Sequence, residues 1–169
     1  MVRHLFEEID LKLKKRKNDY YGEAVMIKHD TIELLRECDE GIQMGIGTLD
    51  DVKDHVTNDE FRKCLDDYQR EYANLQNEME ELLHTYHDKG KDPNPLAQGM
   101  AWMKTNMTIT FNDSVAKIAD IITDGCNMGI KSLNKYLNQY KAADDRAKDF
   151  AKRLINLQER QVEQMRQYL

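Results

Sequence analysis

The sequence predicts an all-α protein, an up-down four-helix bundle of two helical hairpins joined by a long, partly helical crossover. Long stretches place apolar residues at alternating three- and four-residue spacings, and the chain has only 2 prolines. The third observation is an internal repeat, because EGIQMGIGTL at 40–49 returns at 124–133 as DGCNMGIKSL. Each copy lies in the middle of a predicted helix, which indicates a duplicated hairpin.

Composition narrows the classes of function. The chain has 169 residues, of which 40% are hydrophobic and 33% charged, and its formal net charge is −6. This balance is typical of one soluble, helix-rich domain, and the negative charge argues against nucleic-acid binding. No apolar run reaches the roughly 18 residues that a membrane span needs. The 3 cysteines form no close pair and no signal peptide is visible, so we expect a cytoplasmic protein.

Residues 1–28 are expected to form an N-terminal arm or short helix, ahead of a bundle over residues 29–169. The segment 12–17 is a basic cluster in which every residue except Leu13 is Lys or Arg. We interpret this cluster as a solvated helix end. A contact with an acidic partner or a membrane surface is the alternative.

The first hairpin is expected to join a helix from about Asp30 to Val56 with a second that ends near Asp88. Asn58 or Asp59 suits the N-cap of the second helix, and Gly90 suits the position just after its end. The link is short, so the two helices should run antiparallel. Their inward stripes fall at 31, 35, 38, 42, 45, 49, 52 and 56, and at 61, 65, 68, 72, 75, 79, 82 and 86.

The crossover begins at Pro93 and Pro95, and residues 95–111 predict a short, Met-rich helix. The second hairpin follows, with a helix over about 113–141, capped by the segment 112–114, and another that runs from the turn at 142–144 to the C-terminus. The stripe of the last helix is expected at Phe150, Leu154, Leu157 or Gln158, Val162, Met165 and Leu169.

We expect a homodimer that uses the crossover as its contact surface, around Met100, Trp102 and Met103. A closed four-helix bundle leaves little room inside for a further apolar helix. The second face of that helix should therefore need another chain to cover it. The alternative is that the same residues cap the open side of the bundle within one chain.

The repeat places two glycines on one face of each of two helices, Gly41 and Gly45 in the first, Gly125 and Gly129 in the third. A glycine inside a helix costs roughly 1 kcal/mol relative to alanine, so another feature must offset that cost. We interpret the glycines as a close contact between two antiparallel helices, with Gly45 and Gly129 near the closest approach.

The alternative is that the glycines leave room for a ligand or an ordered water. That space would lie beside Gln43 and Asn127, which occupy equivalent positions in the two copies of the repeat. Two facing side-chain amides can also hydrogen-bond each other without any ligand. Cys38 and Cys126 fall on inward stripes and are expected to be small core residues.

From about residue 29 onward the chain resembles bacterial ferritin-like domains of unknown function. The matching pieces are DEGIQMGI at 39–46, NPLAQGMAWM at 94–103 and DGCNMGIKSL at 124–133. The resemblance implies a ferritin-like four-helix bundle with a pseudo-twofold axis. It implies this fold far more firmly than an activity.

Di-iron members of that superfamily carry one Glu on each of two helices and Glu-x-x-His on each of the other two. In this chain Gln43 and Asn127 stand where the single glutamates would, and no histidine follows His87. A neutral amide is a poor substitute for a bridging carboxylate around iron. We therefore expect no cofactor and no stoichiometric iron or manganese.

The expected function is a non-enzymatic ferritin-like bundle that acts as a structural or binding module. No catalytic triad, phosphate-binding glycine loop or Cys-x-x-Cys pair points to an enzyme. The alternative is a metal-binding or oxidoreductase bundle with a divergent site. Its candidate ligands are four carboxylates: Glu71, Glu78, Asp124 and Glu159.

Overall fold

The computed structural model describes the backbone of residues 2–90 and 114–169 and, within these ranges, side chains from residue 11 onward. The described residues form helices α1 (Val2–Lys53), α2 (Asp59–Thr85), α4 (Val115–Gln139) and α5 (Asp145–Met165), followed by a 3-10 turn, η1 (Arg166–Tyr168). No strand occurs in these ranges, which confirms the all-α class. The crossover and its expected dimer surface at Met100, Trp102 and Met103 lie outside the described residues.

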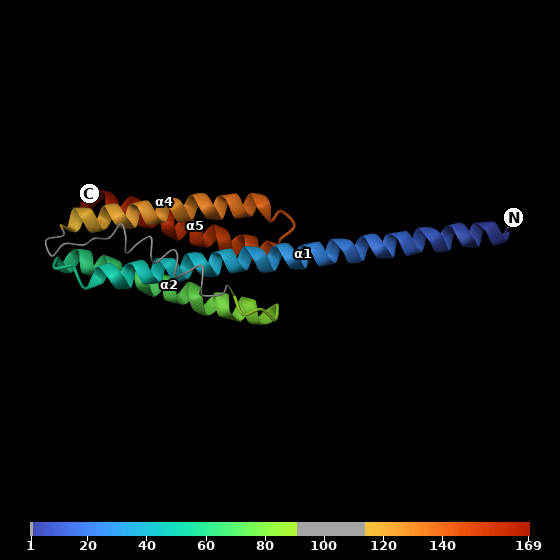
Figure 1. Cartoon of the computed structure of the whole chain (residues 1–169), viewed down its shortest axis with the longest axis horizontal. Coiled ribbons are helices and arrows are strands. Elements are labelled where there is room, and N and C mark those ends of the chain that lie inside the picture. Colours follow the sequence, from blue (N-terminus) through green and yellow to red (C-terminus); the bar gives the residue numbers. More distant parts are fainter. Residues whose placement is uncertain (1, 91–113) are drawn as a thin grey trace.

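The helices pack side by side as two antiparallel hairpins, α1 with α2 and α4 with α5 (Figure 1). The α1 and α4 helices also contact each other and run in opposite directions, as the repeat predicted. The N-terminal half of α1 extends alone beyond the ends of the other three helices.

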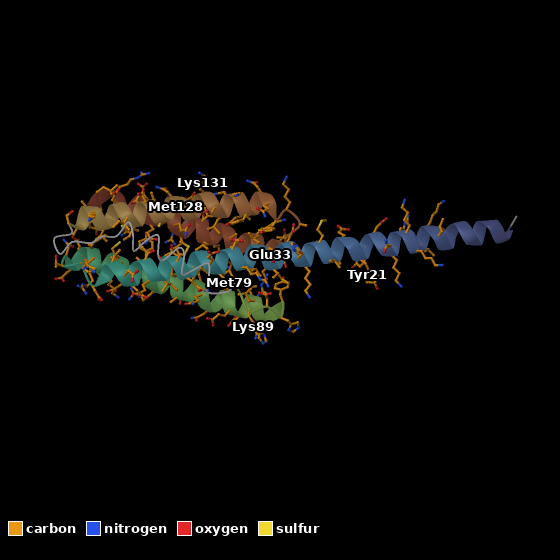
Figure 2. All side chains as sticks on the ribbon, in the orientation of Figure 1. Tyr21, Glu33, Met79, Lys89, Met128 and Lys131 are labelled. Atoms are coloured by element: carbon orange, nitrogen blue, oxygen red, sulfur yellow. The ribbon has the colours of Figure 1, made fainter. Side chains whose placement is uncertain are left out.

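Helix α1 corrects the expectation of a separate N-terminal segment. It is one continuous helix across residues 28 and 29, since no proline interrupts residues 2–53. The side chains of 11–29 are exposed, among them Tyr21 (Figure 2), and the first buried residue among the described side chains is Thr31. The limit near residue 29 therefore marks the start of burial rather than the start of a helix.

The inward stripes were largely predictable. In α2 the predicted positions are buried, apart from Leu75 and the C-cap residue Tyr86, which are half-buried. In α5 both Leu157 and Gln158 are buried, so the two alternatives at that turn are both correct. The expected extension of this stripe to Leu169 is wrong, because that side chain is exposed.

The helix caps follow ordinary side-chain chemistry. Asn58 caps α2 by accepting a bond from the Phe61 backbone N–H at 2.8 Å, and Asp144 caps α5 through Ala147 at 2.8 Å. Ser114 caps α4, as the sequence indicated.

The end of α2 differs from the expectation, because the helix stops at Thr85 and the left-handed residue after its C-cap is His87, with φ 58°, rather than Gly90. The backbone bonds from His87 to His84 and from Asp88 to Leu83, both 3.0 Å, form a Schellman motif.

A group of polar contacts, the polar clasp, joins α1 to the end of α2 and to the turn between α4 and α5. Arg36 binds Asp88 after α2 through two bonds, Nε–Oδ1 at 3.0 Å and Nη2–Oδ2 at 2.7 Å. On the other side, Asp30 accepts the Ala142 backbone N–H at 3.0 Å, and the Thr31 hydroxyl accepts that of Asp144 at 2.9 Å. The clasp fixes the position of α1 just before the repeat begins.

We predict that Asp88→Asn weakens the fold in a pH-dependent manner. The bonds from Arg36 hold the pKa of Asp88 below its ordinary value. The pair therefore stabilises the fold above the unfolded-state pKa of about 4, and this contribution is lost as the pH falls through the lower folded-state pKa. Since the pair is partly exposed, we expect a loss of about 1 kcal/mol at neutral pH in urea unfolding. An equal loss in acid would contradict the prediction.

Candidate functional site

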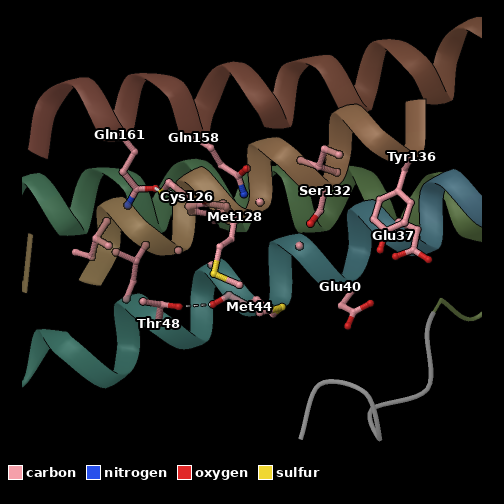
Figure 3. Close-up of a pocket in the computed structure, with 18 residues that line it drawn as sticks. Glu37, Glu40, Met44, Thr48, Cys126, Met128, Ser132, Tyr136, Gln158 and Gln161 are labelled. Atoms are coloured by element: carbon pink, nitrogen blue, oxygen red, sulfur yellow. Dashed lines mark hydrogen bonds between the residues drawn. The ribbon is translucent and has the colours of Figure 1, made fainter. Parts of the chain in front are cut away.

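A pocket of about 200 Å³ lies between α1 and α4, with side chains of α2 and α5 behind it (Figure 3). All four glycines that the repeat singled out line it: Gly41, Gly45, Gly125 and Gly129. Met44 and Met128, which also occupy equivalent repeat positions, meet between the two helices. The duplicated decapeptide therefore forms the two long walls of one pocket.

The two inner glycines, Gly45 and Gly129, have close neighbours. An ideal Cβ on Gly45 would lie 2.6 Å from Cε1 of Tyr72, and one on Gly129 would lie 2.6 Å from Oε1 of Gln158. These tight contacts are made with side chains of α2 and α5. They differ from the expected contact between Gly45 of α1 and Gly129 of α4.

The other two glycines, Gly41 and Gly125, leave room for a Cβ. A Cβ on Gly41 would meet Leu154 at an ordinary contact distance of 3.6 Å, and one on Gly125 would meet no described atom within 4 Å. This geometry leaves room for a side chain at Gly41 and Gly125, while the expected closest approach of the two helices at Gly45 and Gly129 stays a prediction.

The structure corrects the place of the two amides expected beside that space. The Gln43 amide donates to Asp39 of its own helix at 2.9 Å, and Asn127 is exposed on α4. Neither lines the pocket, and they do not bond each other. The amides that do line it are Gln158 and Gln161 of α5, which were not among the predicted site residues. Only Gln158 could have been found from the sequence, because it is a glutamine at a predicted inward position, whereas Gln161 is not on that predicted stripe.

A buried polar group forms the back of the pocket. The Tyr72 hydroxyl and the Cys126 thiol both donate to Oε1 of Gln161, each at 3.2 Å. Gln158 is 4% exposed, and its Oε1 has no hydrogen-bond partner among the described residues. An unsatisfied buried acceptor costs about 1–3 kcal/mol, so this oxygen calls for a partner from outside the described chain.

The titratable groups at the back of the pocket are neutral near pH 7. Burial raises the pKa of the Cys126 thiol to about 12. Burial also raises the pKa of Tyr72 far above its ordinary value, with a smaller contribution from Cys126 and a lowering by the Gln158 amide. Neither group is activated as a nucleophile, because a reactive thiol needs a lowered pKa.

The carboxylates proposed as divergent metal ligands do not converge. Arg160 binds Glu71 at 2.6 Å and Arg153 binds Glu78 at 2.9 Å, in a surface groove between α2 and α5. The Arg153 bond lowers the pKa of Glu78. The other two candidates, Asp124 and Glu159, are exposed and do not line this groove. Within the described ranges, no three His, Cys, Asp or Glu side chains are grouped as a metal site.

Comparison of the chain with protein-family models, curated proteins and solved structures finds no match. The resemblance to ferritin-like domains therefore stays a prediction. In the part of the chain that the structure describes, no helix has the length and apolar character needed to cross a membrane.

Proposed function

We propose that this chain is a non-enzymatic, ferritin-like helical bundle that binds a small molecule in the pocket between α1 and α4. The observation that carries the proposal is the unpartnered Oε1 of Gln158, buried at a pocket whose walls are the repeated glycines. A ligand that donates a hydrogen bond would remove the cost of that oxygen.

The glycines support binding over simple packing. Gly41 and Gly125 lower helix stability, yet no described neighbour requires the absence of a Cβ at either position. What they provide is pocket space. Binding is favoured over catalysis because the pocket wall is mainly apolar and its tyrosine and thiol at the back are neutral.

The second candidate is the divergent metal-binding or oxidoreductase bundle. It would require Glu71 and Glu78 to leave their arginines, so nothing in the geometry favours it. Elemental analysis of untagged protein decides between the two candidates.

The homodimer also stays a proposal. Exposed apolar side chains on the part of α1 that extends beyond the other helices, such as Leu13 and Tyr20, offer a second surface for it.

We predict that Gly125→Leu abolishes ligand binding without unfolding the bundle. The new side chain enters space that no described atom occupies, and the wild-type pocket should bind the neutral probe 2-phenylethanol. Titration calorimetry should show binding to the wild type and none to the variant, while circular dichroism stays unchanged.

Gly22→Leu is the matched control. Gly22 lies in the part of α1 that extends beyond the other helices, and it does not line the pocket. As at Gly125, no described atom lies within 4 Å of its Cβ position. This variant should bind the probe as the wild type does. Equal binding by the wild type and by Gly125→Leu, or no binding by the wild type, would overturn the proposed function.

A further inference from the structure

The part of α1 that extends beyond the other helices, residues 2–29 and here called the arm, carries large apolar side chains in the open (Figure 1). Leu13, Tyr20 and Ile27 are 57%, 71% and 38% exposed. Helices in proteins owe most of their stability to the packing of an apolar face, and the described bundle does not cover this one. The arm therefore favours a partner helix.

The apolar stripe of the arm continues the face by which α1 packs into the bundle. The stripe is made by four residues: Leu13, Tyr20, Ala24 and Ile27. A further step of four residues reaches Thr31, which is fully buried. Leu13 and Thr31 are 18 residues apart, which is about five whole turns, so the two faces have the same helical phase. This continuity is typical of a helix that packs against others along its whole length.

The charges beside the stripe favour a second copy of this chain in the antiparallel orientation. The basic cluster at 12–17 is followed one turn later by Asp19 and then by Glu23. Arg16, Asp19 and Glu23 make no ion pair within the described part of the chain. A parallel copy would align the basic cluster with itself, whereas an antiparallel copy aligns it with the acidic pair.

We propose that the arms of two copies of this chain pair side by side as an antiparallel coiled coil. The register that faces Arg16 with Asp19 of the second copy places the twofold axis between residues 17 and 18. In this register Leu13 lies level with the space between Tyr20 and Ala24 of the second copy, as a knob fits a hole.

The same register uses nearly the whole arm. Residue 5 of one copy lies level with residue 30 of the other, which is where α1 enters the bundle. The paired region of 26 residues is about 39 Å long, so the two bundles lie at its opposite ends. Charge and length therefore select one register independently.

Lys17 is the residue that opposes this pairing, because it lies beside the twofold axis and faces its own copy. It is at the edge of the apolar stripe, and its side chain is exposed. A long lysine side chain extends its charge into water, where salt screens the repulsion. A single like-charged pair costs less than the alignment of two whole basic clusters.

The mass of the full chain and two leucine variants test the contact. Sedimentation equilibrium at micromolar concentration should give twice the mass of one chain. Leu13→Ala should weaken the dimer at least about tenfold, because each dimer loses two side chains from the centre of the contact. Leu11→Ala is the matched control, since Leu11 is 71% exposed but lies about 160° around the helix from Leu13. It should leave the dimer unchanged.

Charge substitutions test the register. Arg16→Glu and Asp19→Arg should each weaken the dimer about three- to tenfold, because each places like charges opposite one another. The two substitutions together should restore it to near the wild-type level. In a parallel pair Arg16→Glu would instead strengthen the dimer, by removing the repulsion between two arginines, and that result would contradict the proposal.

Cysteine cross-linking tests the orientation directly. Lys17→Cys should form a disulfide between chains with a copper–phenanthroline oxidant, because the two copies of this position lie beside the axis. Ile27→Cys should not, because its two copies lie about 28 Å apart along the pair. The native cysteines, Cys38, Cys64 and Cys126, are buried. Cross-linking of both variants would show a parallel pair and overturn the proposed orientation.

Two further outcomes would overturn the proposal as a whole. One is a wild-type chain that stays monomeric, whether or not it sediments with vesicles of anionic lipid, since vesicle binding would assign the arm to a membrane surface. The other is a dimer that Trp102→Ala dissociates and Leu13→Ala does not, which would assign the contact to the crossover. None of these measurements involves the pocket between α1 and α4, so their failure leaves the proposed function standing.

Discussion

Replacing Gly45 with alanine is expected to destabilise the bundle by about 1–3 kcal/mol, whereas Gly125→Ala should stabilise it by up to about 1 kcal/mol. The two glycines lie in the same repeated motif and in the middle of equivalent helices. They differ in what a methyl group would meet. Urea unfolding followed by circular dichroism measures both changes.

The expected loss at Gly45 comes from a neighbour that cannot move aside. The added Cβ would lie 2.6 Å from Cε1 and 2.7 Å from Cζ of Tyr72. That side chain is 1% exposed, and its hydroxyl bonds Gln161 at 3.2 Å. Either the ring or helix α1 must shift, and both lie in the packed core.

The expected gain at Gly125 has a different origin. No described atom lies within 4 Å of its Cβ position, so only the higher helix propensity of alanine acts there. Gly22→Ala is the matched control, because Gly22 is equally open but lies outside the pocket. Gly129→Ala should fall between the extremes, since the atoms it meets belong to the end of the flexible Gln158 side chain. Equal changes at Gly45 and Gly125 would refute this account.

The repeat located the walls of the pocket, but helical phase explains why it did not locate the polar groups. Gln43 lies two residues from both Gly41 and Gly45, which is about 200° of rotation around the helix. It therefore points away from the face that the glycines share, and Asn127 has the same relation to its own glycines. The alignment with a di-iron pattern placed both amides at the centre, whereas their phase places them elsewhere.

The partners of the glycines could not be read from the sequence. Tyr72 and Gln158 are both on correctly predicted inward stripes, but which helix each contacts depends on the rotation of α2 and α5 about their axes. The stripe gives the buried face and leaves the neighbour undetermined. The unpartnered oxygen of Gln158 is a property of three-dimensional packing alone.

The expected start of the first helix near Asp30 is wrong for a similar reason. The change in composition there marks the point where α1 leaves the bundle, and it was interpreted as the end of a helix. No helix-breaking proline supported that interpretation. Charge and burial change at this point while the backbone conformation does not.

Asp144→Ala is expected to destabilise the bundle by about 2–3 kcal/mol, against about 1 kcal/mol for Asn58→Ala. Both residues cap the second helix of a hairpin through an equivalent 2.8 Å bond. Asp144 also accepts a bond from the Tyr86 hydroxyl, which joins the start of α5 to the end of α2. The pKa of Tyr86 is raised to about 12, mainly by burial and to a smaller extent by the hydrogen bond to Asp144 and by its charge.

A double-mutant cycle between Asp144→Ala and Tyr86→Phe isolates the contact between the hairpins from the cap. Each single variant removes the Tyr86 bond, so the double variant should lose about 1 kcal/mol less than the sum of the two. The cap bond to Ala147 is lost only in the Asp144 variant. Asn58→Ala measures the stability lost with an equivalent cap bond at a residue that makes no bond to Tyr86. Additive losses would show that the contact contributes nothing to stability, and that the two hairpins are held together at this end by apolar packing and the remaining clasp bonds alone.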